Sequence, residues 1–201
     1  MKAIYPFGNC GKAIASILEF FGEEYKIDDI QTSDCVLIAS KRYKYKLQQE
    51  LQEKNITNYI DGLEYTGKKL NYYLKAKFPK NSVALIYDDY KGQKHFGLVE
   101  SLLRSKNIPI CRFIYPDVLE YETCEYDFVI CQDLIPFLNA FKLFICTGIL
   151  THIPYDSYSL RIPSHYYIFD YHAFYHNPKT RGFWSLKGAI SSAGGGGDFE
   201  Y

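Results

Sequence analysis

Residues 35–56 are CVLIASKRYKYKLQQELQEKNI, and this stretch decides the fold class. Its first five residues form an unbroken apolar run, which is typical of a parallel strand covered on both faces. Ser40 is a candidate cap for a helix that follows. Tyr43, Leu47 and Leu51 recur at helical spacing, with Lys, Gln and Glu between them. The stretch therefore predicts a buried strand followed by an amphipathic helix.

The residues around this stretch repeat the same order. Residues 2–7 (KAIYPF) predict a short buried strand, and the turn GNCGK follows it. Helical spacing then places Ile14, Ile17, Leu18 and Phe21 on one face, and Gly22 ends the helix. Further strands are expected at residues 23–29, which end in two acids, and at residues 56–60. Residues 1–61 thus predict a small doubly wound unit, β-α-β followed by β-α-β.

Residues 62–80 interrupt this pattern and are expected to link two units. They contain Gly62, Gly67 and Pro79, together with five lysines against a single Glu64. Leu70, Tyr73, Leu74 and Phe78 have the spacing of a linker helix. We interpret the lysines as a solvated face rather than a phosphate or membrane site; they are Lys68, Lys69, Lys75, Lys77 and Lys80.

Residues 81–201 predict a second α/β unit. Apolar runs indicate strands at residues 83–88, 109–115, 126–131, 143–150 and 166–169. Between them, Val99, Leu102 and Leu103 indicate one helix, and residues 133–141 a shorter one. Because strands alternate with helices, right-handed crossovers and a parallel sheet are expected. The fold class is therefore α/β, with two small Rossmann-like units whose parallel sheets are flanked by helices.

Composition excludes several classes of protein. The 201 residues carry 23 Lys and Arg against 23 Asp and Glu, so a broadly basic nucleic-acid-binding surface is not expected. The most apolar stretch, residues 128–150, contains Asp133, Pro136, Asn139 and Lys142, which a membrane span tolerates poorly. None of the six cysteines forms a C-x-x-C pair, and four lie in apolar runs. These features predict a cytoplasmic protein without disulfides, zinc or a transmembrane segment.

The turn after the first strand is the first candidate site. In open parallel sheets, ligands bind beyond the carboxyl ends of the strands, where glycines let a phosphate approach a helix N-terminus. Pro6 occupies the first glycine position of a dinucleotide fingerprint, but Gly8 and Gly11 keep the other two, with Asn9 and Lys12 beside them. A nucleotide phosphate would be held here by Gly8, Asn9, Gly11 and Lys12. A ribose hydroxyl would be held by Asp28 or Asp29. The alternative is that the glycines serve only helix–strand packing.

Residues 4–61 resemble a small Rossmann-like module of bacterial surface-polysaccharide and methyltransferase-type proteins. The resemblance rests on the Gly-x-x-Gly-Lys turn, the Asp-Asp pair after the second strand and residues 35–56. The second unit resembles the N-terminal lobe of two-lobed GT-B-type transferases, in particular the CDP-glycerol glycerophosphotransferase group. These resemblances imply a nucleotide-linked donor of the CDP or UDP type, and a polysaccharide or lipid-linked acceptor. They also imply that residues 81–201 are the first lobe of a longer transferase.

Polar residues at the predicted strand ends of the second unit supply candidates for catalysis. Asp88 and Asp89 follow one strand, and His95 comes shortly after them. A second strand is followed by Gln132 and Asp133, and a third by Thr147 and His152. Residues 164–176 are SHYYIFDYHAFYH, in which Asp170 and His172 follow a predicted strand.

An aspartate can orient an imidazole as a general base, so we expect His172, oriented by Asp170, to deprotonate an acceptor hydroxyl. His95 or His152 would stabilise phosphate charge. A metal site at His165, His172 and His176, or an aromatic-rich strand with no catalytic role, are the alternatives.

Together these features predict a nucleotide-activated glycosyl or glycerophosphoryl transferase, or a domain of one, acting in surface-polysaccharide synthesis. The expected partners are a sugar-nucleotide or CDP-alcohol and the acceptor, with no nucleic acid; peripheral association with a membrane stays open. One alternative is a non-catalytic module that binds a nucleotide or docks a partner enzyme. A weaker one is an NAD-dependent oxidoreductase, which Pro6 and the lack of an evident hydride-acceptor site disfavour.

Overall fold

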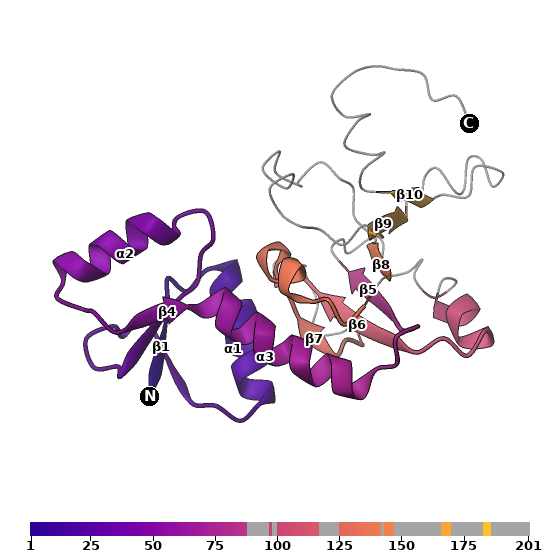
Figure 1. Cartoon of the computed structure of the whole chain (residues 1–201), viewed down its shortest axis with the longest axis horizontal. Coiled ribbons are helices and arrows are strands. Elements are labelled where there is room, and N and C mark those ends of the chain that lie inside the picture. The colour runs from indigo at the N-terminus through magenta and orange to yellow at the C-terminus, as the bar shows by residue number, and fades with distance from the viewer. Residues whose placement is uncertain are drawn as a thin grey trace, which may run out of the picture.

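The computed structural model describes residues 1–87, 97, 100–116, 125–141, 143–146, 166–169 and 183–185. Two sheets flanked by helices make up these parts, and the fold is α/β, as predicted (Figure 1). The first sheet has four parallel strands in the order β2-β1-β3-β4. Their bounds are β1 Lys2–Tyr5, β2 Tyr25–Ile27, β3 Cys35–Ile38 and β4 Tyr59–Asp61.

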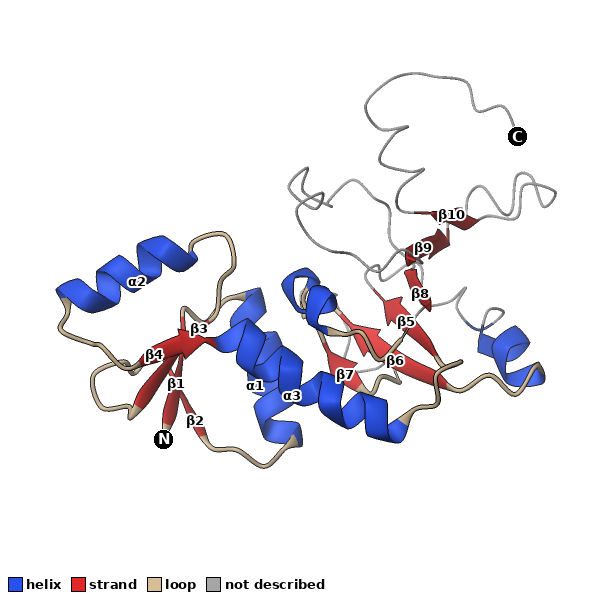
Figure 2. Cartoon of the chain, in the orientation of Figure 1, coloured by secondary structure: helices blue, strands red, loops and turns tan. Residues whose placement is uncertain are grey.

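Both faces of the first sheet are covered by helices, which explains the unbroken apolar run in β3. Successive side chains of a strand point to opposite faces. Leu37 accordingly packs with α1 (Asn9–Phe20), whereas Val36 and Ile38 pack with Leu47 and Leu51 of α2 (Lys44–Glu53). Figure 2 shows α2 on one side of the sheet and α1 with α3 on the other.

The segment expected to be a linker folds as the helix α3 (Gly62–Lys77). Asp61 caps it, because its carboxylate accepts a hydrogen bond of 3.0 Å from the Glu64 N–H. Leu63, Leu70 and Leu74 are fully buried in the larger core cluster, which contains residues of both sheets. The helix therefore belongs to the core that joins the two units.

The second sheet has six strands in the order β10-β9-β8-β5-β6-β7. Their bounds are β5 Val83–Tyr87, β6 Ile110–Ile114, β7 Phe128–Val129, β8 Leu143–Cys146, β9 Tyr166–Phe169 and β10 Phe183–Ser185. Five strands are parallel, as predicted, and β9 has the predicted bounds. The sequence did not predict β10, which pairs antiparallel with β9 at the sheet edge.

An aromatic cluster joins the first unit to the second. Phe20 and Phe21 at the end of α1, Tyr73 of α3 and Phe128 of β7 contact one another edge to face, with ring centroids 4.8 to 6.2 Å apart. The 3-10 helix η2 (Gln132–Phe137), which lies where a short helix was predicted, packs against α3. Such ring contacts add roughly 0.5–1.5 kcal/mol per pair to the effect of burial.

Two details differ from the predicted amphipathic faces. Tyr43 is not part of the buried stripe of α2, because the helix begins only at Lys44 and the Tyr43 side chain is 54% exposed. Ser40 caps the preceding turn instead, where its hydroxyl accepts a hydrogen bond of 3.1 Å from the Tyr43 N–H. Leu102 is 59% exposed, and Leu103 alone of the pair packs on the core.

Within the described ranges, no helix combines the length and the apolar character that a bilayer span requires.

Candidate functional site

The carboxyl ends of β1 and β3 meet at one edge of the first sheet, because these two strands are parallel neighbours. After β1 the chain enters α1 on one face of the sheet, and after β3 it enters α2 on the other. The strand order therefore reverses between β1 and β3. In open α/β sheets this point is the usual position of a ligand crevice.

The N-terminus of α1 faces this edge without a protein cap. Gly8 is the N-cap residue and has extended backbone, and no side chain of the described residues caps the helix. The first hydrogen bond of the helix runs from the Lys12 N–H to the Gly8 carbonyl, at 2.8 Å. The N–H groups of Asn9, Cys10 and Gly11 precede it and have no acceptor within the helix. Such N–H groups, together with the helix dipole, favour an anion.

Gly8 and Gly11 have different roles in the turn. A Cβ at Gly11 would lie 3.0 Å from the Pro6 carbonyl oxygen and 3.1 Å from the Phe7 ring, so glycine is needed there for the helix to approach β1. A Cβ at Gly8 would meet nothing within 4 Å, and its φ of −104° suits any residue. The packing alternative thus accounts for Gly11. At Gly8 no steric contact requires glycine, although glycine is among the residues favoured at an N-cap.

The polar residues predicted to surround this turn are placed as follows. Asn9 and Lys12 are exposed on the first turn of α1. Asp28 lies next to the turn, since its carboxylate accepts a hydrogen bond of 3.1 Å from the Phe7 N–H. Asp29 instead accepts from Thr32 at 2.6 Å and pairs with Lys26 at 3.1 Å. The hydrogen bond from Thr32 is the main reason that the pKa of Asp29 is lowered. Of these two acids, Asp28 therefore contacts the turn that leads into the helix, and Asp29 belongs to the neighbouring loop.

Beside this edge, the first turn of α1 contacts the second unit. The Cys10 thiol donates to Asp133 Oδ2 at 3.5 Å, and it also hydrogen-bonds to Cys131. That second bond and burial raise the pKa of Cys131 well above its usual range. Asp133, a predicted strand-end residue, thus meets the glycine turn, a contact that sequence spacing does not reveal. The described residues contain no group of three or more His, Cys, Asp or Glu side chains that could hold a metal ion.

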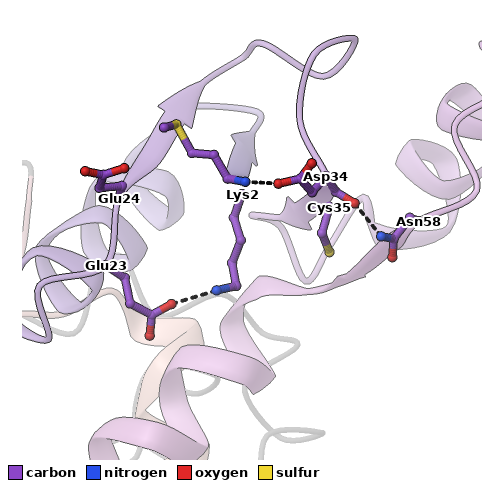
Figure 3. A pocket seen from close by; sticks show the side chains of 7 residues that line it. Lys2, Glu23, Glu24, Asp34, Cys35 and Asn58 are labelled. Atoms are coloured by element: carbon purple, nitrogen blue, oxygen red, sulfur yellow. Dashed lines mark hydrogen bonds and ion pairs between the residues drawn. The ribbon is translucent and has the colours of Figure 1, made fainter.

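The opposite edge of the first sheet holds an open pocket of about 350 Å³, which the sequence did not predict (Figure 3). Glu23 is one of the residues that line it and accepts three contacts: Lys2 donates to it at 2.7 Å, Tyr65 at 3.1 Å, and Lys69 also pairs with it. Burial alone would raise the pKa of Glu23, but the hydrogen bonds from these three donors lower it to about 2. Because Glu23 accepts from Lys2 of β1 and from Tyr65 and Lys69 of α3, its carboxylate links these two elements.

The residues predicted to carry catalysis lie outside the part of the chain that the structure describes. They are His95, His152, Asp170 and His172, and the candidate metal residues His165 and His176 lie outside it too. The described strands show only where the segments that contain these residues leave the second sheet. Since β5, β8 and β9 are parallel, Tyr87, Cys146 and Phe169 end at the same edge of the second sheet. Asp88 and Asp170 directly follow two of these residues in the sequence.

Comparisons of the chain with models of protein families, with curated proteins and with solved structures returned no match. The class that the described residues define is an α/β protein with two Rossmann-like sheets.

Proposed function

We propose that the chain is a nucleotide-activated glycosyl or glycerophosphoryl transferase, or a domain of one, and that its first sheet binds the phosphates of the donor. One observation carries the proposal: a helix N-terminus without a side-chain cap lies at the point where the strand order reverses, and the space beside its N-cap residue Gly8 is open. A phosphate bound there would accept hydrogen bonds from the N–H groups of Asn9, Cys10 and Gly11. Lys12, exposed on the same turn, would neutralise part of its charge.

The remainder of the proposal rests on the sequence. His172, oriented by Asp170, would accept the proton of an acceptor hydroxyl as that oxygen attacks the donor, while His95 or His152 would stabilise the phosphate that leaves. The donor would be a CDP- or UDP-linked sugar or alcohol, and the acceptor a polysaccharide or a lipid-linked glycan. Surface-polysaccharide synthesis in the cytoplasm is the proposed setting.

Calorimetric titration of the full chain with CDP-, UDP- and GDP-linked donors tests the phosphate site. Gly8→Val places a branched side chain over the helix N-terminus, in a backbone conformation that valine favours. We expect it to weaken donor binding at least tenfold, roughly the effect of losing one or two charge-assisted hydrogen bonds. We also compare Lys12→Gln with Lys75→Gln. The second variant removes the charge of an exposed lysine on α3 and is therefore the matched control. Donor binding that Gly8→Val leaves unchanged contradicts the site.

Turnover separates the enzyme from a binding module. His172→Ala is expected to abolish transfer from a donor that the chain still binds. If the full chain binds donors yet transfers nothing to any acceptor, the first sheet acts as a nucleotide-binding module. If transfer proceeds at the original rate in His172→Ala, the assignment of the base is wrong.

A further inference from the structure

A cluster of cations and tyrosines lies between the end of β3 and the first turn of α2. We define the basic-aromatic patch as Lys41, Arg42, Tyr43, Tyr45 and Lys46, five of the six residues of the sequence KRYKYK. All five are exposed. The proposed nucleotide site does not use them.

The cations of the patch are free of ion pairs. Among the described residues, neither Lys41, Arg42 nor Lys46 has a carboxylate within ion-pair distance. Lys44, between them, differs because it pairs with Asp61 at 2.8 Å. The first acid along α2 is Glu50, whose carboxylate pairs with Lys54 at 2.6 Å. Among the described residues these three positive charges are thus exposed and form no ion pair, although Lys46 lies close enough to Glu50 to help lower the pKa of that carboxyl.

The tyrosines of the patch point away from the core. Tyr43 is 54% exposed and Tyr45 is 81% exposed, whereas Leu47 and Leu51 of the same helix are buried against the sheet. The Arg42 guanidinium lies 5.4 Å from the centroid of the Tyr43 ring, so cation and ring share one surface. Two exposed rings beside three cations therefore form one amphipathic surface on this side of the chain.

We propose that the basic-aromatic patch docks the chain on a membrane surface that carries anionic lipid headgroups. Charge complementarity supports this partner, because clustered Lys and Arg are attracted to anionic leaflets. Tyrosine rings prefer the membrane–water interface, where the ring is shielded and the hydroxyl stays hydrated. A nucleic acid is the less favoured partner, since it needs a longer basic track, and α2 continues with Glu50 and Glu53.

Flotation of the full chain with lipid vesicles tests the patch. We compare vesicles of phosphatidylcholine alone with vesicles that contain about 30% phosphatidylglycerol, at low and at high salt. Each cation near an anionic surface strengthens binding about fivefold. The triple variant Lys41→Gln, Arg42→Gln, Lys46→Gln should therefore bind the anionic vesicles on the order of 100-fold more weakly.

The lysines on and after α3 provide a matched control. Lys75, Lys77 and Lys80 are exposed, and their replacement by Gln removes the same charge from elsewhere on the chain. Tyr45→Ser is likewise matched by Tyr72→Ser, because both side chains are 81% exposed. Circular dichroism and thermal unfolding confirm that each variant is folded.

The outcomes are distinct. The proposal holds if the wild-type chain binds anionic but not neutral vesicles, and if only the patch variants lose binding. It is overturned if the chain floats equally with both vesicles, if the control triple loses as much, or if the patch instead binds a single-stranded oligonucleotide more tightly than anionic vesicles. Donor titration of the same variants is independent, because the patch lies outside the phosphate site, so the two proposals can fail separately.

Discussion

Gly67 of α3 lies directly against Phe137 of η2: a Cβ at position 67 would be only 2.6 Å from the Phe137 Cβ and 2.8 Å from its Cγ. Real side chains do not approach so closely, so only glycine allows η2 to pack on the helix at this distance. Gly67 is itself buried within α3. The contact between these two residues thus sets how closely the second unit packs on the first.

Gly67→Ala should destabilise the chain by about 1–3 kcal/mol, because the added methyl group forces η2 away from α3. Alanine also gains up to about 1 kcal/mol in helix propensity over glycine, and we expect overpacking to outweigh that gain. Urea unfolding followed by circular dichroism measures the difference. Because the closest atom is the Phe137 Cβ, which alanine would keep, a compensating change has to be Phe137→Gly, and the double variant should lose less than the sum of the two single losses. An increase in the stability of Gly67→Ala alone would show that this packing is wrong.

The two glycines of the β1–α1 turn should respond differently to alanine. Gly11→Ala places a methyl group 3.0 Å from the Pro6 carbonyl oxygen, and a loss of about 1–3 kcal/mol is expected. Gly8→Ala should cost no more than about 1 kcal/mol, because the space there is open and only the N-cap preference for glycine over alanine is lost. Thermal unfolding of both variants checks the contrast, and equal losses would refute the separate roles assigned to them.

Acid should weaken the chain through Glu23. Its pKa is about 2 in the folded protein, against an ordinary value of 4.5, because Lys2, Lys69 and Tyr65 hold the charged form against the opposing effect of burial. A lowered carboxyl pKa stabilises the folded state above the unfolded pKa, and that stability is lost as the pH falls toward 2. The shift corresponds to about 3 kcal/mol at most. Urea midpoints measured between about pH 5 and pH 2 should fall accordingly.

Glu23→Gln provides the control for this acid dependence. The variant keeps the shape of the side chain but cannot titrate, so it should be less stable than the wild type near neutrality. Its urea midpoint should also depend less steeply on pH below about 4.5. If both proteins lose stability in parallel over this interval, other carboxylates cause the acid dependence.

Two buried cysteines should resist alkylation in the folded chain. Burial raises the pKa of Cys111, and the hydrogen bond that the Cys131 thiol makes to Cys10, together with burial, raises the pKa of Cys131. Iodoacetamide reacts with the thiolate, so both sites should be modified slowly at mildly alkaline pH and rapidly in urea. Peptide mass spectrometry after timed quenching gives the rates at each site. Fast modification of Cys131 in the native protein would show that the contact between α1 and η2 opens readily.

Much of the fold could be predicted, because strands and helices depend on patterns within a few residues. The apolar run of residues 35–38 predicts the strand β3, and the spacing of Ile14, Ile17 and Leu18 predicts the helix α1. Besides the exposed Leu102, two departures have identifiable physical causes. Tyr43 follows the helical spacing but precedes the first helical residue, and β10 is a short edge strand whose pairing depends on β9.

Only part of the candidate site could be predicted from local sequence patterns. The glycines and Lys12 could be located from their position after a strand, but the distinct roles of Gly8 and Gly11 depend on which atoms lie within reach of each Cα. Asp28 and Asp29 were equivalent by spacing. The hydrogen bond from Phe7 selects Asp28, because it forms across two neighbouring strand ends.

By itself the sequence determined the α/β class, the succession of elements and the edge at which polar groups gather, because each depends on periodicity along a short segment. Only the tertiary structure decided that Glu23 meets Lys69, that Cys10 meets Asp133 and that Gly67 meets Phe137. Those residues lie far apart along the chain, and no local pattern encodes such pairs. They come together because α3 packs against both the first sheet and η2, burying one apolar core that the two units share.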